Sequence, residues 1–238
     1  MAVASGEVVD NQFYVDIGAQ DGVLGSQSLG FAKKGWAGVC YEADPELCEV
    51  MSSLYGSMPD VKIRQGFITP ENVCDLLSRD GVPENFGFLN LDVDSYDYFI
   101  LESLLNKYSP QVICVEINEI IPPPIKFAVK YFPEIVWSGD NFQGFSIQIA
   151  KVICEKYGYA INQLHYNNLI LVKRDNVSID DKSIEEIYDA GYKNRPGRKE
   201  HFIHNRDHEQ ILDMEKDKAF EYIQDLFKEN IEYCVLEA

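Results

Sequence analysis

Oxygen-bearing side chains stand at the ends of two apolar runs in the second quarter of the chain. Asp92 and Asp94 close the first run, and Glu116 and Asn118 close the second. Each pair is spaced by two residues, so in neighbouring parallel strands one pair can face the other. Four converging oxygen donors are typical of a hard-cation site such as Mg²⁺. Without a cation the carboxylates would repel one another or raise a pKa; capping of the adjoining loops is the alternative role.

A second candidate site follows the β-forming residues 13–17. Three glycines arrive within eight positions, at Gly18, Gly22 and Gly25. A strand, a glycine turn and a helix start bring backbone close to a ligand and present unpaired N–H groups to it. The spacing differs from the dinucleotide fingerprint G-x-G-x-x-G, and Asp16 and Asp21 would repel a pyrophosphate. Carboxylates suit a cation instead, such as the ammonium and sulfonium of S-adenosylmethionine.

The ribose of such a ligand needs a carboxylate acceptor one strand further along. Glu42 ends the next β-forming run, 37–42, about 20 residues after the glycine turn, and is the expected ribose ligand. An NAD-type oxidoreductase is the alternative on a Rossmann sheet, and the absent glycine fingerprint disfavours it. A tight turn with an incidental acidic residue is the remaining interpretation.

Two segments carry a family resemblance. Asp16-Ile-Gly-Ala-Gln-Asp-Gly22 followed by Tyr41-Glu-Ala-Asp-Pro45 resembles the first two motifs of class I S-adenosylmethionine-dependent methyltransferases. The resemblance covers about residues 13–173. It implies that the loop starting at Gly66 lies over the adenine, with Phe67 and Ile68 as a stacking wall, although a plain surface loop explains them equally well. The residues expected to bind the cofactor are Asp16, Gly18, Ala19, Asp21, Gly22, Glu42, Ala43, Gly66, Phe67 and Asp92.

The acidic pairs resemble metal-dependent small-molecule O-methyltransferases of the catechol and sugar-tailoring types. That resemblance implies Asp92, Glu116 and Asn118 as metal ligands. The chain departs from the catechol type, in which the second pair is adjacent Asp-Asn, because Ile117 separates Glu116 from Asn118. The run Leu91-Asp-Val-Asp-Ser-Tyr-Asp-Tyr98 is also similar to FkbM-type methyltransferases, which act mainly on hydroxyls of sugars and natural products.

These resemblances imply methyl transfer to a hydroxyl of a small molecule such as a sugar, a nucleotide-linked sugar or a natural-product intermediate. The reaction is an in-line displacement that needs the acceptor oxygen held about 3 Å from the methyl and relieved of its proton. A bound Mg²⁺ would lower the hydroxyl pKa; without metal, Asp94 would be the general base. The expected catalytic residues are Asp92, Asp94 and Glu116. A non-catalytic partner subunit of the same fold is a further alternative.

Composition narrows the partners. The 39 Asp and Glu against 21 Lys and Arg give a net charge of −18, which argues against nucleic acid or an anionic membrane as the main partner. Six scattered cysteines without C-x-x-C spacing are typical of reduced residues in a cytoplasmic protein. No leader-like segment and no apolar run of about 18 residues is present.

Alternating patterns predict an α/β domain at 13–175 with a mostly parallel seven-stranded Rossmann-like sheet. A tail at 1–12 precedes it, and an α-rich appendage at 176–238 follows, which covers the substrate side or forms an oligomer contact. The expected strands are 13–17, 37–42, 61–65, 88–94, 112–117, 160–165 and 169–173, with helices between them. One of these helices is expected at 24–34, and another begins at 69–72, with Thr69 as N-cap and Asn72 at the capping-box position. Residues 231–236 are a candidate closing strand. The long proline- and aromatic-rich segment 119–145 is expected to be a substrate lid.

Two features of the appendage remain open. His201, His204 and His208 would share one face of a helix, as a metal site or a catalytic base, but an ordinary solvated surface is favoured. The nearby cluster of Arg195, Arg198, Lys199 and Arg206 suits an anionic substrate or is an ordinary charged surface.

Overall fold

The computed structural model describes residues 11–23, 28–133, 139–176 and 182–238, and these divide into two compact units. Unit 1 runs to residue 93 and also takes 100–115 and 175–177. Unit 2 takes 94–99, 116–174 and 178–238. Part of the predicted helix at 24–34 and part of the predicted lid fall outside the described residues.

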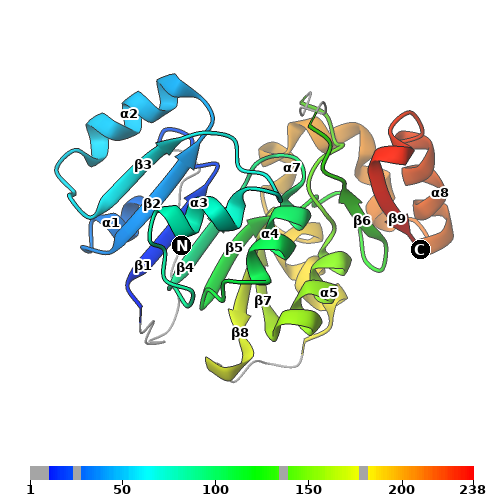
Figure 1. The fold of residues 1–238 in the computed structure, drawn as a ribbon. Coiled ribbons are helices and arrows are strands. Elements are labelled where there is room, and N and C mark those ends of the chain that lie inside the picture. The colour runs from blue at the N-terminus through cyan, green and yellow to red at the C-terminus, as the bar shows by residue number, and fades with distance from the viewer. Residues whose placement is uncertain (1–10, 24–27, 134–138, 177–181) are drawn as a thin grey trace. The chain divides into compact units, whose positions relative to one another are not determined.

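The main sheet has seven strands in the order β3-β2-β1-β4-β5-β8-β7. The strands β1 to β5 are parallel to their neighbours where the register is defined, and β7 runs antiparallel to β8. Their bounds are β1 Phe13–Ile17, β2 Ala37–Glu42, β3 Val61–Gln65, β4 Phe88–Leu91, β5 Val112–Glu116, β7 Tyr159–His165 and β8 Asn168–Lys173. The mostly parallel Rossmann-like sheet that the sequence predicts is therefore confirmed (Figure 1).

Close packing between adjacent strands explains why small residues stand where they do in unit 1. Tyr14 is the register partner of Gly38, and a Cβ on Gly38 would lie 2.4 Å from the Tyr14 ring. Phe31 packs against Trp36 and Phe88 with ring centroids 4.6 and 4.7 Å apart. The buried runs of β1, β2 and β4 form the core of this unit, as expected for parallel strands covered on both faces.

Helices alternate with the strands of the main sheet. They are α1 Leu29–Ala32, α2 Pro45–Tyr55, α3 Val73–Arg79, α4 Asp97–Leu105 and α5 Ile147–Tyr157. The capping expected at 69–72 is present, because Thr69 and Asn72 exchange backbone-to-side-chain hydrogen bonds of 2.8 and 3.3 Å. The helix itself begins at Val73 and not at Thr69. The box therefore precedes the regular helix.

The segment 119–145 contains a strand where the sequence predicts only a loop. This strand, β6 (Lys126–Val129), pairs antiparallel with β9 (Cys234–Glu237), and the closing strand predicted at 231–236 is thus confirmed in its C-terminal part. Phe127 lies 5.9 Å from Phe142 and 5.1 Å from Phe227, centroid to centroid. Unit 2 thereby ties the chain end to the segment after β5.

The rest of the tail is mainly helical, as predicted. It comprises α6 Ile184–Tyr188, a π-helical turn Asp189–Lys193, α7 Arg198–His201, a 3₁₀ segment Ile203–Asp213, α8 Lys216–Leu226 and a 3₁₀ turn Ile231–Tyr233; a further 3₁₀ turn, Arg174–Asn176, follows β8. Ser183 caps α6 through a full capping box with Glu186. None of the described helices has the length and apolarity that a membrane span requires.

A buried carboxylate joins β2, β3 and the end of α3. Asp80 accepts hydrogen bonds from Arg64 Nε at 2.7 Å and from the Tyr41 hydroxyl at 2.8 Å. Burial works to raise the pKa of Asp80, but the hydrogen bonds from Arg64 and Tyr41 outweigh it and hold the pKa below its ordinary value of 3.8. The ionised form is therefore the one that the fold stabilises.

Replacing Asp80 by asparagine is expected to lower the free energy of unfolding by about 2 kcal/mol at pH 7, because the amide keeps only one of the two acceptor oxygens and no negative charge beside Arg64. A group with a depressed folded-state pKa contributes its full stability above the unfolded pKa and loses it as pH falls through the folded one. The difference between wild type and variant in the free energy of unfolding, measured in urea, should therefore become smaller below pH 3.8. A gap independent of pH would contradict the ion pair as its cause.

Candidate functional site

The glycine turn after β1 is held against the ends of two neighbouring strands in unit 1. The amides of Gly18 and Ala19 donate to the Tyr41 carbonyl at 3.0 and 3.1 Å, and the Asp92 amide donates to the Ile17 carbonyl at 3.0 Å. Gly18 has φ +78, and a Cβ there would lie 1.6 Å from the Asp92 carbonyl oxygen. Only glycine lets the turn approach β4 this closely. The structure thus brings the ends of β1, β2 and β4 together, as predicted for the cofactor site.

Glu42 ends β2 with both carboxylate oxygens fixed by backbone. One accepts from the Gln20 amide at 2.8 Å and the other from the Asp44 amide at 2.9 Å. Each carboxylate oxygen has a second lone pair, so Glu42 still offers acceptors to two hydroxyls. The bond from Gln20 places this carboxylate beside the glycine turn, which is where a ribose would need it.

Two other acidic residues of the turn, Asp16 and Asp21, accept hydrogen bonds from groups of the protein. The Asp16 side chain is fully buried and accepts from Asn90 Nδ2 at 2.9 Å. Asp21 accepts from the Val23 amide at 2.8 Å and so closes its own turn. Gly22 follows with φ +77, and a Cβ there would lie 2.7 Å from the Tyr55 ring of α2. These residues shape the turn and make its surroundings acidic.

The two residues expected to stack on an adenine lie in the loop after β3 and differ in exposure. The Gly66 amide donates to the Glu42 carbonyl at 2.8 Å, which anchors this loop to the end of β2 beside Ala43. The Phe67 side chain is 72% exposed, whereas Ile68 is buried. Ile68 therefore packs in the core, and Phe67 is the ring that a planar ligand can reach.

Three carboxylates gather after β4 and β5. Asp92, Asp94 and Glu116 each contribute an oxygen, and these oxygens lie within 4.8 Å of one another. Asp94 has φ +55, a left-handed conformation uncommon for a residue with a side chain. Among the described residues, this is the one group of three or more acidic, histidine or cysteine ligands with such a spacing. Oxygen atoms of this kind are the ligands that hard cations prefer.

Asn118 and Asn167 belong to unit 2, as Glu116 does. Asn118 is buried, and its side-chain nitrogen donates to the carbonyls of Asn141 and Gln143 at 2.8 and 2.9 Å, which leaves its oxygen as the atom it can offer to an ion. The Asn167 side chain donates to Glu116, and its carbonyl accepts from the Ile117 amide at 2.9 Å. The sequence pattern missed Asn167, because an asparagine pair between two strands reads as a hairpin turn.

The three histidines of the appendage do not share one helical face. They lie in or beside a 3₁₀ segment and contact different partners. His201 stacks on Tyr166 with ring centroids 4.8 Å apart, and His208 Nδ1 lies 2.8 Å from the Tyr222 hydroxyl. His204 faces the buried Glu119. They do not share a face because Phe202 separates α7 from the 3₁₀ segment, and because four positions at three residues per turn rotate His208 about 120° away from His204.

The basic cluster has internal partners as well. Arg198 is buried and binds Glu209 through both terminal nitrogens, and Lys199 lies 3.3 Å from the same carboxylate. The Arg195 guanidinium lies 4.4 Å from the centre of the Tyr166 ring. The Glu209 contacts fix the fold of the tail around α7.

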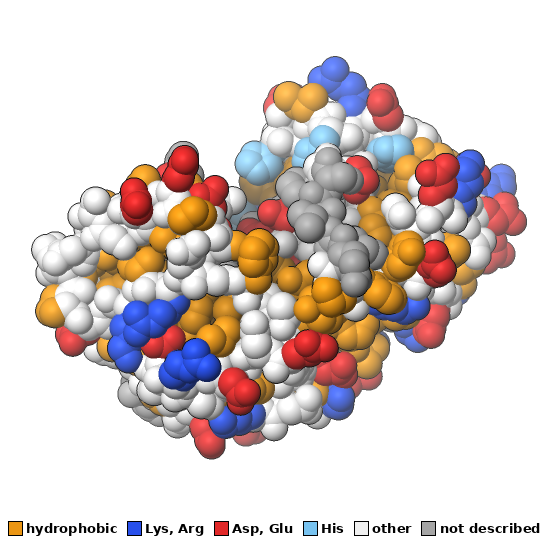
Figure 2. All heavy atoms as spheres, turned by 45° about the horizontal axis from the view of Figure 1, so that its top comes forward, with side chains coloured by type: hydrophobic (Ala, Val, Ile, Leu, Met, Phe, Trp, Pro, Cys, Tyr) orange, Lys and Arg blue, Asp and Glu red, His pale blue; other side chains and the backbone are white. Residues whose placement is uncertain are grey.

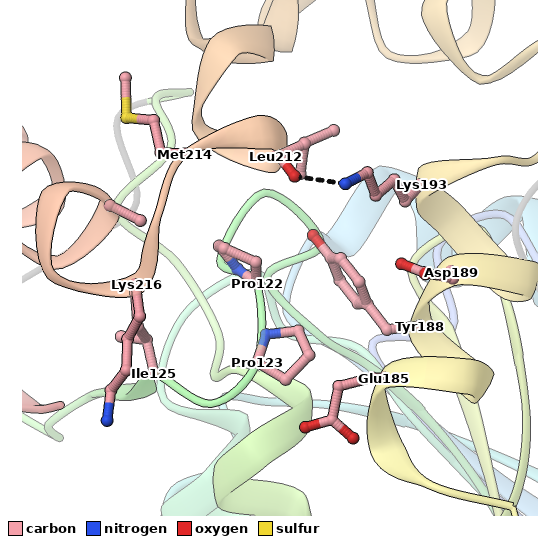
Figure 3. Close-up of a pocket in the computed structure, with 11 residues that line it drawn as sticks. Pro122, Pro123, Ile125, Glu185, Tyr188, Asp189, Lys193, Leu212, Met214 and Lys216 are labelled. Carbon is pink, nitrogen blue, oxygen red and sulfur yellow. Dashed lines mark hydrogen bonds between the residues drawn. The ribbon is translucent and has the colours of Figure 1, made fainter.

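A small pocket of about 210 Å³ opens elsewhere in unit 2. Pro122 and Pro123 line one side of it, and residues of the tail line the other (Figure 3). Two of its polar groups have partners: the Tyr188 hydroxyl donates to the Glu119 carbonyl at 2.5 Å, and Lys193 donates to the Leu212 carbonyl at 2.6 Å. Tyr188 thus forms a wall of the pocket and holds the backbone of Glu119.

Strand order, the glycine turn after β1 and the acidic residue that ends β2 now define the architecture. It is the class I methyltransferase fold. No protein-family model matches the sequence, and no curated protein matches it either. The fold assignment therefore rests on the topology.

Solved structures with similarity to this chain include three methyltransferases. An O-methyltransferase from Bacillus cereus in complex with S-adenosylhomocysteine has 19% identity and a TM-score of 0.45, over 69% of this chain and 76% of that one. The N-terminal domain of EvdMO1 with S-adenosylhomocysteine bound has 14% identity and a TM-score of 0.43, over 68% and 74%. The bifunctional kinase-methyltransferase WbdD has 17% identity and a TM-score of 0.43 over 71% of this chain, which spans 36% of WbdD.

Proposed function

We propose that the protein transfers a methyl group from S-adenosylmethionine to a hydroxyl of a small molecule. The observation that carries this proposal is the Glu42 carboxylate, fixed by two backbone amides beside the glycine turn. A carboxylate oriented in this way accepts hydrogen bonds from vicinal hydroxyls, such as those of a ribose. It would repel a pyrophosphate.

The surrounding residues fit the same ligand. Asp16, Asp21, Glu42 and Asp92 make this part of unit 1 acidic, which favours a ligand with an ammonium and a sulfonium. The exposed ring of Phe67 offers a face for a planar base. When bound, the donor supplies an electrophilic methyl group on a positively charged sulfur. The chain's own task is to position the acceptor oxygen and to accept its proton.

A divalent cation would be held by Asp92, Asp94 and Glu116, with the Asn118 oxygen as a further ligand. Carboxylate oxygens within 4.8 Å of one another support this part of the proposal. The Asn167 amide would orient Glu116, as hydrogen-bonded neighbours do for ligating carboxylates. The ion would lower the pKa of an acceptor hydroxyl bound to it.

The proposed acceptor is a hydroxylated small molecule: a sugar, a nucleotide-linked sugar or a natural-product intermediate. The test is incubation with methyl-labelled S-adenosylmethionine and separate pools of sugars, nucleotide sugars and polyphenols, with Mg²⁺ or with EDTA. Label should appear on an oxygen, more slowly with EDTA, and Glu42→Gln should lose it. Label on a nitrogen would contradict the acceptor class, and an unchanged rate in EDTA would remove the cation.

A further inference from the structure

The pocket of about 210 Å³ lies wholly within unit 2. Its walls come from residues 122–125 before β6, from residues 185–193 of α6 and the turn after it, and from residues 212–219 around the start of α8. An apolar cavity of roughly 150 Å³ holds benzene, so this volume has room for a body slightly larger than a benzene ring. Drug-sized ligands occupy pockets of about 300 Å³ or more, so a whole nucleotide would not fit inside.

The inner surface of the pocket is apolar and is held in place by its own contacts. Ile125 and Ala219 are each 1% exposed, and Pro122 and Pro123 add two rings without backbone N–H groups. The buried Tyr188 ring also lines the pocket, and its hydroxyl donates to a backbone carbonyl at 2.5 Å (Figure 3). A surface fixed in this way loses little freedom when it binds a ligand, and its rings suit an aromatic body.

Among the described residues, two carboxylates of the lining have no partner. Glu185 and Asp189 lie four positions apart, and the Asp189 amide donates to the Glu185 carbonyl, so the two side chains leave the helix on the same side. Neither side chain forms a hydrogen bond or an ion pair with the described part of the protein. Glu186, which stands between them in the sequence, is instead used in the capping box with Ser183. Like charges at this spacing disfavour each other, so an ammonium group beside them would be stabilised.

A lysine on another wall carries the opposite charge. Lys216 opens α8, and its ammonium forms no ion pair and no hydrogen bond with residues that the structure describes. Lys193 is occupied, because its ammonium donates to the Leu212 carbonyl at 2.6 Å and lies 3.0 Å from the Asp213 carboxylate. Figure 3 shows Lys216 and Glu185 on different segments of the lining, and both side chains are exposed. The opening of the pocket therefore offers charges of both signs that are not paired with each other.

We propose that this pocket binds a small zwitterion with an apolar body, namely a free amino acid with a side chain of about benzyl size. The side chain lies against Tyr188 and the two prolines, where its apolar surface leaves water. The ammonium lies beside Glu185 and Asp189, and the carboxylate lies beside Lys216. A ligand with a single charge would leave one side of the opening without a partner. Binding here is non-covalent and requires no methyl transfer.

The first test is calorimetry with three probes of nearly equal size. L-Phenylalanine carries both charges, phenethylamine lacks the carboxylate, and 3-phenylpropionate lacks the ammonium. L-Phenylalanine should bind most tightly, and each analogue should bind at least about threefold more weakly, because each loses one ion pair at an exposed opening. Either analogue binding as tightly as L-phenylalanine would overturn the zwitterion, and so would the absence of heat at about 10 mM L-phenylalanine.

The second test assigns each charge of the ligand to its partner. The double variant Glu185→Gln, Asp189→Asn should weaken L-phenylalanine and phenethylamine at least about threefold and leave 3-phenylpropionate unchanged. Lys216→Gln should weaken L-phenylalanine and 3-phenylpropionate and leave phenethylamine unchanged. The opposite pattern, or an equal effect of one variant on all three probes, would overturn the assignment.

Exposed charges of the same helix outside the pocket lining supply the matched controls. Glu221→Gln and Lys218→Gln change the net charge by the same sign as the pocket variants, and both residues lie on α8. They should bind all three probes as wild type does. Equal melting temperatures of the pocket variants and wild type would show that the variants fold. A loss in either control as large as in the pocket variants would contradict a local site.

General attraction of cations to an acidic protein needs its own control. The net charge is −18, and Figure 2 shows acidic side chains in several separate places on one face of the molecule. Methylammonium carries the charge of phenethylamine without its body. It should bind at least about tenfold more weakly than phenethylamine, because no ring is buried. Equal affinities of the two amines would show surface attraction only and would overturn the pocket.

S-adenosylhomocysteine separates this site from the proposed cofactor site. Its own amino-acid group could draw L-phenylalanine to the glycine turn of unit 1 instead. Saturating S-adenosylhomocysteine should leave the affinity for L-phenylalanine unchanged, and displacement would overturn the assignment to the pocket. If wild type fails to bind S-adenosylhomocysteine, the proposed function fails, and the variants alone decide on the pocket.

Discussion

Gly18→Ala is expected to lower the free energy of unfolding by at least about 3 kcal/mol and to abolish binding of S-adenosylhomocysteine. The left-handed backbone at φ +78 costs an alanine about 1–2 kcal/mol. The added Cβ would also lie 1.6 Å from the Asp92 carbonyl oxygen, so the turn and the end of β4 must separate. Urea unfolding and calorimetry measure the two effects.

Gly35→Ala is the matched control. Gly35 has nearly the same backbone conformation, φ +81, but no atom within 4 Å of an added Cβ. The substitution should lower the free energy of unfolding by about 1 kcal/mol and leave the binding of S-adenosylhomocysteine unchanged. Equal losses in the two variants would show that backbone conformation alone matters, and would remove the close approach of β1 to β4 from the account.

Glu116→Gln is expected to reduce methyl transfer about 100-fold with little change in folding. The variant keeps the size of the side chain but removes a charged oxygen from the group formed with Asp92 and Asp94. A lost ligand of this kind weakens metal binding about 10- to 100-fold and leaves the acceptor hydroxyl with its ordinary acidity.

EDTA distinguishes a metal role from a direct role of Glu116. If Glu116 acts through a cation, EDTA should slow wild type to the rate of the variant and should slow the variant no further. Both changes would then remove the same contribution to the rate, that of the bound cation. Glu155→Gln on α5, a half-exposed surface carboxylate paired with Lys151, should behave as wild type. Equal fold-losses in EDTA for wild type and variant would contradict the metal role of Glu116.

The parallel part of the fold was predictable because its signals are local. Residues 13–17 and 112–117 are mostly apolar runs of strand length, and the glycines that follow the first run mark its turn. Glu42 could be predicted as a ribose ligand from its separation along the sequence from that turn. The capping pair at 69 and 72 was recognisable, although the regular helix starts later.

The missed features depend on partners distant in the sequence. The strand at 126–129 follows three prolines and is stabilised by pairing with residues 234–237, more than 100 positions away. Glu119 accepts a hydrogen bond from Asn205, which lies 86 positions further along the chain. No period or spacing encodes such contacts, so only the folded chain reveals them.

The most direct test of the account is calorimetry of S-adenosylhomocysteine binding to wild type and to Glu42→Gln, with Glu46→Gln on α2 as the control and NADH as the competing ligand. Wild type and Glu46→Gln should bind S-adenosylhomocysteine with equal affinity. Glu42→Gln should bind it at least about tenfold more weakly, because the charged acceptor is missing. NADH should produce no heat of binding. Binding of NADH in place of S-adenosylhomocysteine, or an undiminished affinity in Glu42→Gln, would contradict it.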